Sequence, residues 1–378
     1  MGTVGEKGHP WASPEGSDEE RGRNGPTGRS LSRRNFVGLT AAASMVTPAV
    51  LQDVARRETK PEEAPPVVVA SLPEASPDRG EQAVRGALLD AREAGVEIAF
   101  LPVAALEDYR GASRNLLRLY RHLEGLRGQV VLARKVPELR EARRRGLLAV
   151  VAQFQGLQMV LEDLSVIHEF SSAGVGVMAL THNWKNWNGD GCLERTDLRL
   201  TGLGELAVQA FNDSGILLDL SRAGRRTSLH AMELSRHPVI FSNSNAAGVH
   251  DHPRNLTDAQ IDACAASDGV IGITAFPTFV GLGRPNLDRV LDHVEYVANR
   301  VGVEHVGLGL GFTDRVAKRF DSDPLPDSVP SYPAGIEGIE AFPRLRNALE
   351  IRGFGAGAVE AILGGNLYRA LERVWVTA

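Results

Sequence analysis

Eight short apolar runs, each followed by a segment with helical spacing, constrain the fold of this chain more than any other feature. The runs are rich in Val, Ile and Leu without strict polar alternation, which is typical of strands buried on both faces. They cover residues 67–71, 96–101, 148–154, 175–181, 216–220, 239–241, 270–275 and 306–310. Strands that alternate with helices form a parallel sheet. The pattern therefore predicts an α/β fold, a single-domain (β/α)8 TIM barrel over residues 66–378, with a doubly wound open sheet as the alternative.

The segments between the runs have the spacing of amphipathic helices. Leu116, Leu119 and Leu123 form one apolar stripe, and Thr257-Asp258 opens a later helix as candidate caps. The histidines of these segments are expected to be solvated or to cap helices; they are His168, His230, His293 and His305.

The composition narrows the class of protein. Hydrophobic residues make up 43% of the chain and charged residues 24%, as in an ordinary globular protein rather than a polytopic membrane protein. The net charge of −5 argues against a nucleic-acid partner, which usually needs a basic domain. Two cysteines, Cys192 and Cys264, are too few for a disulfide framework or a four-cysteine zinc site.

The first 65 residues differ from the rest. Residues 1–29 are rich in Gly, Pro, Ser and charge and are predicted to be disordered. Arg33-Arg34-Asn35-Phe36-Val37 and the apolar stretch after it resemble a twin-arginine export signal over residues 30–51, followed by a linker over 52–65. We expect a periplasmic or extracytoplasmic protein, tethered to the membrane if the signal stays uncleaved. The apolar stretch is too short for a membrane span, so none is expected in the mature chain.

In such a barrel, functional residues stand at the carboxyl ends of the strands. The residues after the predicted strands are polar, but divalent metals need several His, Asp, Glu or Cys ligands that converge. Among these positions His182 is the one good donor, and Asp219 lies within its strand, where it could face the helices.

Two further segments could reach the pocket. His250-Asp251-His252 is read as a surface loop with capping roles rather than as a metal pair. Residues 314–333, rich in proline, are predicted to form a long loop over the pocket, in which Asp314 could turn inward. The sequence contains no nucleophile elbow, no P-loop and no His-Glu-x-x-His motif.

An ordered series of short motifs resembles the membrane dipeptidase (renal dipeptidase) family of zinc metallopeptidases. The motifs are Leu180-Thr181-His182-Asn183, Gly202-Leu203-Gly204, Asp219-Leu220-Ser221, Pro238-Val239-Ile240-Phe241-Ser242, His252-Pro253-Arg254-Asn255 and Leu363-Gly364-Gly365-Asn366. The resemblance extends from about residue 67 to the end of the chain. It implies a (β/α)8 barrel with two bridged zinc ions that hydrolyses dipeptides, including some with D-residues. The family often forms dimers, so a homodimer is the corresponding expectation.

Compared position by position, the resemblance implies a divergent member that lacks the metal ligands. The family's His-x-Asp pair falls on Ser71 and Pro73, and its bridging Glu falls on Gln155. Its two further histidine ligands and an active-site Asp fall on Arg222, Asn243 and Gly311. An arginine cannot ligate a metal because its guanidinium stays protonated. We therefore expect no metal and no other cofactor.

Two residues of the family's site are retained. His182 matches the histidine that contacts the reacting group, and Arg254 matches the arginine that holds the substrate's carboxylate. These matches favour an exported, dipeptidase-like protein that binds a small anionic or dipeptide-like ligand without zinc-dependent hydrolysis. Arg222 and Arg254 would clamp a carboxylate. The expected hydrogen-bonding residues are His182, Asn183, Gln155 and Asn243.

Two alternatives stay open. The first is an active dipeptidase with a single-metal or metal-free site, in which His182 acts as a general acid or base. The second is a structural or interaction role for the barrel. Trp184 and Trp187 near the mouth are then a partner surface, although a pocket lid or packed core is the favoured reading of both.

Overall fold

The computed structural model describes residues 66–69, 71–161, 163–312 and 332–376. The predicted disordered segment, signal and linker over residues 1–65 lie outside these residues, as does Asp314 with nearly all of its predicted loop.

Eight parallel strands follow one another around a barrel in chain order, each hydrogen-bonded to the next. Each of the eight runs that the sequence marks overlaps one of these strands, so the predicted (β/α)8 barrel is confirmed. The strands are β1 (Val68–Val69), β2 (Ile98–Ala104), β4 (Leu148–Phe154), β5 (Val175–Ala179), β6 (Leu217–Asp219), β7 (Ile240–Phe241), β8 (Val270–Ile273) and β9 (Val306–Leu308). A ninth strand, β3 (Val130–Leu132), pairs with β4 beside this path and was not predicted.

The barrel is nearly closed. Within the described residues no ladder joins β9 to β1, and the turn Ala361–Gly365 contacts both strands instead. Gly364 lies directly against the backbone of Pro66 and Val68, so a side chain at this position would have no room. The Gly-Gly-Asn sequence near the end of the chain thus fits the last helix to the seam of the barrel.

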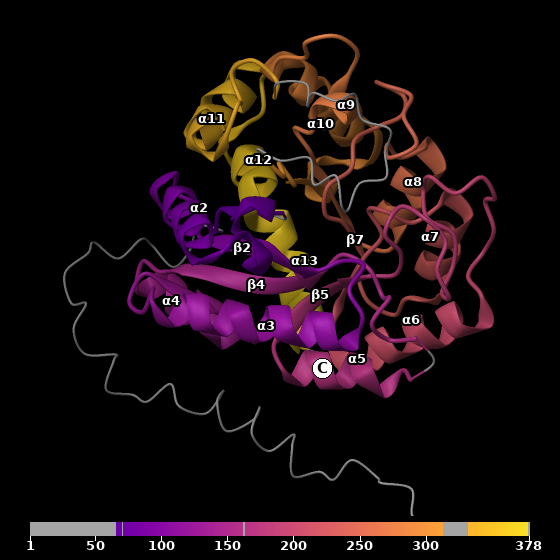
Figure 1. The fold of residues 1–378 in the computed structure, drawn as a ribbon. Helices are drawn as coiled ribbons and strands as arrows, with labels where there is room; N and C mark the ends of the chain where they lie inside the picture. The colour runs from indigo at the N-terminus through magenta and orange to yellow at the C-terminus, as the bar shows by residue number, and fades with distance from the viewer. Residues whose placement is uncertain (1–65, 70, 162, 313–331, 377–378) are drawn as a thin grey trace, which may run out of the picture. The chain divides into compact units, whose positions relative to one another are not determined.

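Helices surround the strands on the outside (Figure 1). The apolar stripe of Leu116, Leu119 and Leu123 is buried against the sheet, as predicted, and Thr257 forms a capping box with Gln260. The main helices are α2 (Glu81–Glu93), α3 (Tyr109–Glu124), α4 (Val136–Arg144), α5 (Ser165–Ser172), α6 (Gly202–Ser214), α7 (Arg225–Leu234), α8 (Asp258–Ala266), α10 (Leu287–Val301), α11 (Phe342–Ile351) and α13 (Asn366–Val376). The short helices are α9 (Pro277–Val280) and α12 (Ala356–Glu360).

One end of the barrel is covered by the last helix. Leu367, Leu371 and Val374 of α13 share an apolar cluster with residues at the starts of the strands, among them Val68 and Val270. Because α13 covers the amino-terminal end, the carboxyl end of the strands is left as the mouth. No helix among the described residues is both long and apolar enough to cross a membrane.

Candidate functional site at the carboxyl end of the barrel

The residues predicted at three neighbouring strand ends meet through the side chain of Arg222. Arg222, after β6, donates to Oε1 of Gln155 after β4 and to Oδ1 of Asn183 after β5, both over 3.4 Å. His182 is 2% exposed, and its Nδ1 lies 3.1 Å from the carbonyl oxygen of Gln155. A carbonyl can only accept a hydrogen bond, so Nδ1 carries the proton and Nε2 is the basic nitrogen of this ring.

Arg254 joins the ends of β6 and β7. Its side chain is buried, and its Nη2 donates to Oδ1 of Asn243 over 3.0 Å and to the Asn243 carbonyl over 3.3 Å. Its Nη1 donates to the carbonyl oxygen of Ser221. The guanidinium carbon lies 5.0 Å from the centre of the Phe279 ring, which backs the cation. The buried Nε of Arg254 has no hydrogen-bond partner in the described part of the chain.

The buried carboxylate of Asp219 holds the ends of β6 and β7 together from inside the barrel. Asp219 accepts from the backbone nitrogens of Ser221 and Ser242 over 2.9 and 3.1 Å, and from both of their hydroxyls over 2.5 Å. It also accepts from Nε2 of Gln153 over 2.8 Å. Gln153 stands on β4, which is not adjacent to β6, so this contact crosses the barrel interior. Asp219 therefore faces the interior and not the helices.

Ser71 and Gly311 lie together on the other side of the mouth. A Cβ built on Gly311 would stand 3.8 Å from the Ser71 hydroxyl and 3.8 Å from the Thr274 hydroxyl. Gly311 has a φ of 60°, a conformation that glycine adopts without strain. Pro73 does not join this group but opens the 3-10 turn Pro73–Ala75.

A cavity of about 250 Å³ opens beside the mouth, between the loops that follow β5, β6 and β7. Ser221 and Arg254 belong to its wall, whereas His182 and Arg222 do not. Three further charged residues of the wall had no sequence signal: Glu194 and Asp197 from the loop after β5, and Arg225 at the start of α7.

The cluster His250-Asp251-His252 does not form a metal pair. Burial, with the nearby charges of Arg254 and His250, lowers the pKa of His252 to about 4. Its Nδ1 accepts from the backbone nitrogen of Arg254 over 3.1 Å, while Nε2 of His250 lies 3.2 Å from the carbonyl of Thr278. His252 lines the cavity wall as a neutral ring.

The residues present do not fit a pair of zinc ions. Nowhere in the described ranges do three His, Cys, Asp or Glu residues stand where they could hold a metal ion together. Six residues occupy the positions that the resemblance matches to the family's metal and active-site residues, and they are a serine, a proline, a glutamine, an arginine, an asparagine and a glycine. The amide oxygen of Gln155 already accepts from Arg222, and that of Asn243 accepts from Arg254. Two zinc ions would add about four positive charges beside a guanidinium that cannot lose its own.

Residues 91–378 match the family described as membrane dipeptidase (Peptidase family M19). The chain is 29% identical over 277 residues to dipeptidase verJ of Clonostachys rogersoniana, covering 73% of this chain and 68% of that protein. It is 30% identical over 238 residues to an uncharacterized dipeptidase of Schizosaccharomyces pombe, covering 62% of this chain and 54% of that protein.

Solved structures agree with the fold. An amidohydrolase from Pseudomonas aeruginosa is 27% identical with a TM-score of 0.76, covering 82% of this chain and 97% of its own. A metallopeptidase from Rhodobacter sphaeroides, liganded with a phosphinate mimic of the dipeptide L-Ala-D-Ala, is 21% identical with a TM-score of 0.71. That alignment covers 83% of this chain and 100% of the other, and it supports the fold alone.

Proposed function

Because the chain belongs to the membrane dipeptidase family, we propose that the mouth of its barrel binds a dipeptide-like molecule through that molecule's carboxylate. The proposal rests on the burial and the hydrogen bonds of Arg254. Its guanidinium is buried beside a cavity, both of its Nη atoms are held by oxygens of the fold, and its buried Nε–H has no partner among the described residues.

A buried donor without a partner costs about 1–3 kcal/mol, and a carboxylate oxygen in the cavity would remove that cost. The bond would be charge-assisted and therefore stronger than a neutral one. Arg222 lies outside the wall of this cavity, but it places a second guanidinium at the neighbouring ends of β4 and β5, on Gln155 and Asn183. The two arginines thus favour an anionic ligand over a neutral or cationic one.

The comparisons favour hydrolysis of the ligand's peptide bond, since the relatives are named dipeptidases. The residue of this chain suited to move a proton is His182, whose Nδ1 is fixed on the Gln155 carbonyl and whose Nε2 can take up a proton. The donor set favours a second candidate, namely binding without zinc-dependent hydrolysis. Neither candidate involves zinc, because the residues of this chain do not fit that metal.

Metal analysis of the purified full-length protein, combined with a dipeptide-hydrolysis screen, separates the two candidates. Turnover that persists after chelation supports hydrolysis by the chain's own residues, and binding without turnover supports the second candidate. Two stoichiometric zinc ions with chelator-sensitive turnover would overturn the account of the site.

Substitution of Arg222 tests the clamp, since its hydrogen bonds to Gln155 and Asn183 are long at 3.4 Å and leave the guanidinium able to turn to a ligand. We expect Arg222→Gln to weaken dipeptide binding about tenfold, as loss of one charge-assisted contact does. Arg226→Gln removes an exposed arginine of α7 and serves as the matched control. Equal affinities of the two variants would contradict the clamp.

Export and self-association are also parts of the proposal. A reporter fused to residues 1–65 tests whether the twin-arginine-like segment directs export, with Arg33→Lys and Arg34→Lys together as the inactive control. Light scattering of the purified protein tests the proposed homodimer.

A further inference from the structure

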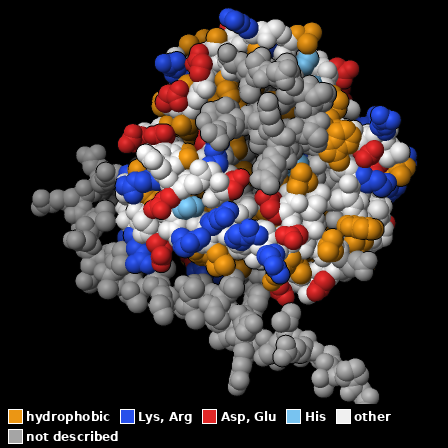
Figure 2. All heavy atoms as spheres, in the orientation of Figure 1, with side chains coloured by type: hydrophobic (Ala, Val, Ile, Leu, Met, Phe, Trp, Pro, Cys, Tyr) orange, Lys and Arg blue, Asp and Glu red, His pale blue; other side chains and the backbone are white. Residues whose placement is uncertain are grey.

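The outer side of α3 carries a row of arginines that the proposed function does not use. Arg110, Arg114, Arg118 and Arg121 are spaced by four, four and three residues, so they lie on one side of the helix. Leu117 lies between them and is 42% exposed. We call these five residues the arginine face. Figure 2 shows a row of Lys and Arg side chains across the front of the molecule, over α3.

The charges of the arginine face are not compensated within the described structure. Residues 109–123 contain no Asp or Glu. The flanking acids are engaged elsewhere, since Asp108 caps the helix through the Gly111 nitrogen and Glu124 pairs with Arg127 at 3.3 Å. Arg118 donates to Asn115 alone, and no ion pair of Arg110, Arg114 or Arg121 is found in the described ranges.

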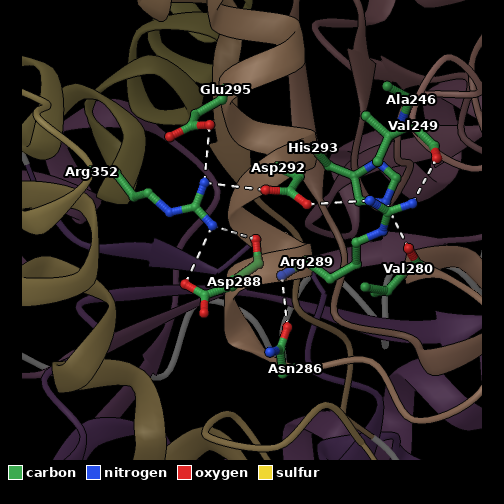
Figure 3. A network of polar contacts seen from close by, with 10 residues as sticks. All are labelled: Ala246, Val249, Val280, Asn286, Asp288, Arg289, Asp292, His293, Glu295 and Arg352. Atoms are coloured by element: carbon green, nitrogen blue, oxygen red, sulfur yellow. Dashed lines mark hydrogen bonds and ion pairs between the residues drawn. The ribbon is translucent and has the colours of Figure 1, made fainter.

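Arginines on other helices of the same protein behave differently. Arg352 pairs with Asp288, Asp292 and Glu295 of α10, as Figure 3 shows. Arg300 pairs with Asp258 at 2.8 Å and with Asp262 at 2.6 Å. Like charges four residues apart weaken a helix, so an uncompensated row on α3 is a cost to the fold. An anionic partner would remove that cost.

From these observations we propose that the arginine face binds the surface of an anionic lipid bilayer. The four guanidinium groups extend over roughly 17 Å of a straight helix and could each meet a lipid phosphate. Leu117 between them could enter the boundary between headgroups and acyl chains. A nucleic acid or an acidic protein would gain little from an exposed leucine at the centre of the face.

Membrane contact through α3 would leave the mouth of the barrel open to solvent. Because α3 follows the carboxyl end of β2 and runs back along the outside of the barrel, contact through α3 would lay the barrel on its side. The site at the carboxyl end would then face along the membrane surface. This inference is independent of the proposed function, since it uses none of the residues at the mouth.

Co-sedimentation of the full-length protein with vesicles tests the proposal. We expect binding to phosphatidylcholine vesicles that contain 30% phosphatidylglycerol (the composition of the probe), little binding to pure phosphatidylcholine, and a loss of binding as salt rises. Each arginine near an anionic surface contributes roughly a fivefold gain in affinity. The triple variant R110Q/R114Q/R121Q should therefore bind roughly a hundredfold more weakly.

The matched control is R226Q/R284Q/R344Q, which removes the same charge from exposed arginines on separate elements and should bind nearly as the wild type does. Leu117→Ser distinguishes binding to a bilayer from binding to a soluble polyanion. It should weaken binding to vesicles and leave binding to heparin unchanged. Equal losses in the two triple variants, no preference for anionic vesicles, or an unchanged L117S would each overturn the proposal.

Discussion

His293 gives the barrel a stability that depends on pH, and the structure sets the size of the effect. The residue stands on α10 and is 0% exposed. Its Nδ1 accepts from the backbone nitrogen of Ala246 over 3.2 Å, and its Nε2 donates to the carbonyl of Val280 over 3.0 Å (Figure 3). Burial lowers the pKa of His293 to about 4, with a smaller contribution from the nearby Arg289. A second proton would have to displace the Ala246 N–H.

The sign of the effect follows from proton linkage. The unfolded chain takes up a proton at the ordinary pKa of 6.5, whereas the folded chain resists protonation until about pH 4. The free energy of unfolding therefore stays level above pH 6.5 and falls as the pH drops from 6.5 to 4. The full loss is about 3 kcal/mol, of which about 2.5 kcal/mol has been lost at pH 4.5.

Urea unfolding of the wild type and of His293→Gln, at pH 7.5 and at pH 4.5, measures this loss. The variant should be less stable at pH 7.5, since the Ala246 nitrogen loses its acceptor, but its stability should fall less on acidification. We expect the gap between the two proteins to shrink by about 2.5 kcal/mol at pH 4.5. His168→Gln, which removes an exposed imidazole, is the matched control. Parallel pH dependences of the wild type and His293→Gln would refute the reasoning.

Three further changes have expected outcomes in thermal or urea unfolding. Asp219→Asn should cost about 3 kcal/mol, because an amide cannot accept all five hydrogen bonds of the carboxylate. Gly309→Ala should lower the melting temperature by more than about 5 °C, because its methyl group would collide with the Ser242 carbonyl. Gly202→Ala is the control, because a methyl group at this position would face open space. An equal drop in its melting temperature would contradict the explanation by collision. Thr257→Ala should cost about 1 kcal/mol by removing the capping box, whereas Thr257→Ser should retain it.

The strands could be predicted because each is a compact run of apolar residues buried on both faces. The ends of the strands were predicted less accurately. β2 continues from Ile98 to Ala104 through Pro102, where a bulge takes up the missing backbone donor, although the apolar run suggested an end at residue 101. β3 was missed because it is only three residues long, two of them are only partly buried, and it pairs with one neighbour.

The rim of the site could be predicted because strand ends converge in a barrel, whereas the cavity could not. Much of its wall is built from loops whose positions depend on contacts distant in the sequence, as for Cys192 and Glu194. For the same reason His293 was wrongly expected to be solvated or to cap a helix; the β7–α8 loop and α9 bury it. Trp184 and Trp187 are 40% and 63% exposed, so packing in the core is excluded for both.

We propose that Arg254 holds the carboxylate of a dipeptide-like ligand, in a site whose residues do not fit the family's two zinc ions. Calorimetric titration of the chelator-treated, full-length protein with a dipeptide, and with the same dipeptide as its C-terminal amide, tests it most directly. The account predicts that the dipeptide binds without added metal and that the amide binds about 10- to 100-fold more weakly, because it lacks the charge-assisted partner of Nε. Equal affinities for the two, or binding that appears only after zinc is restored, would contradict it.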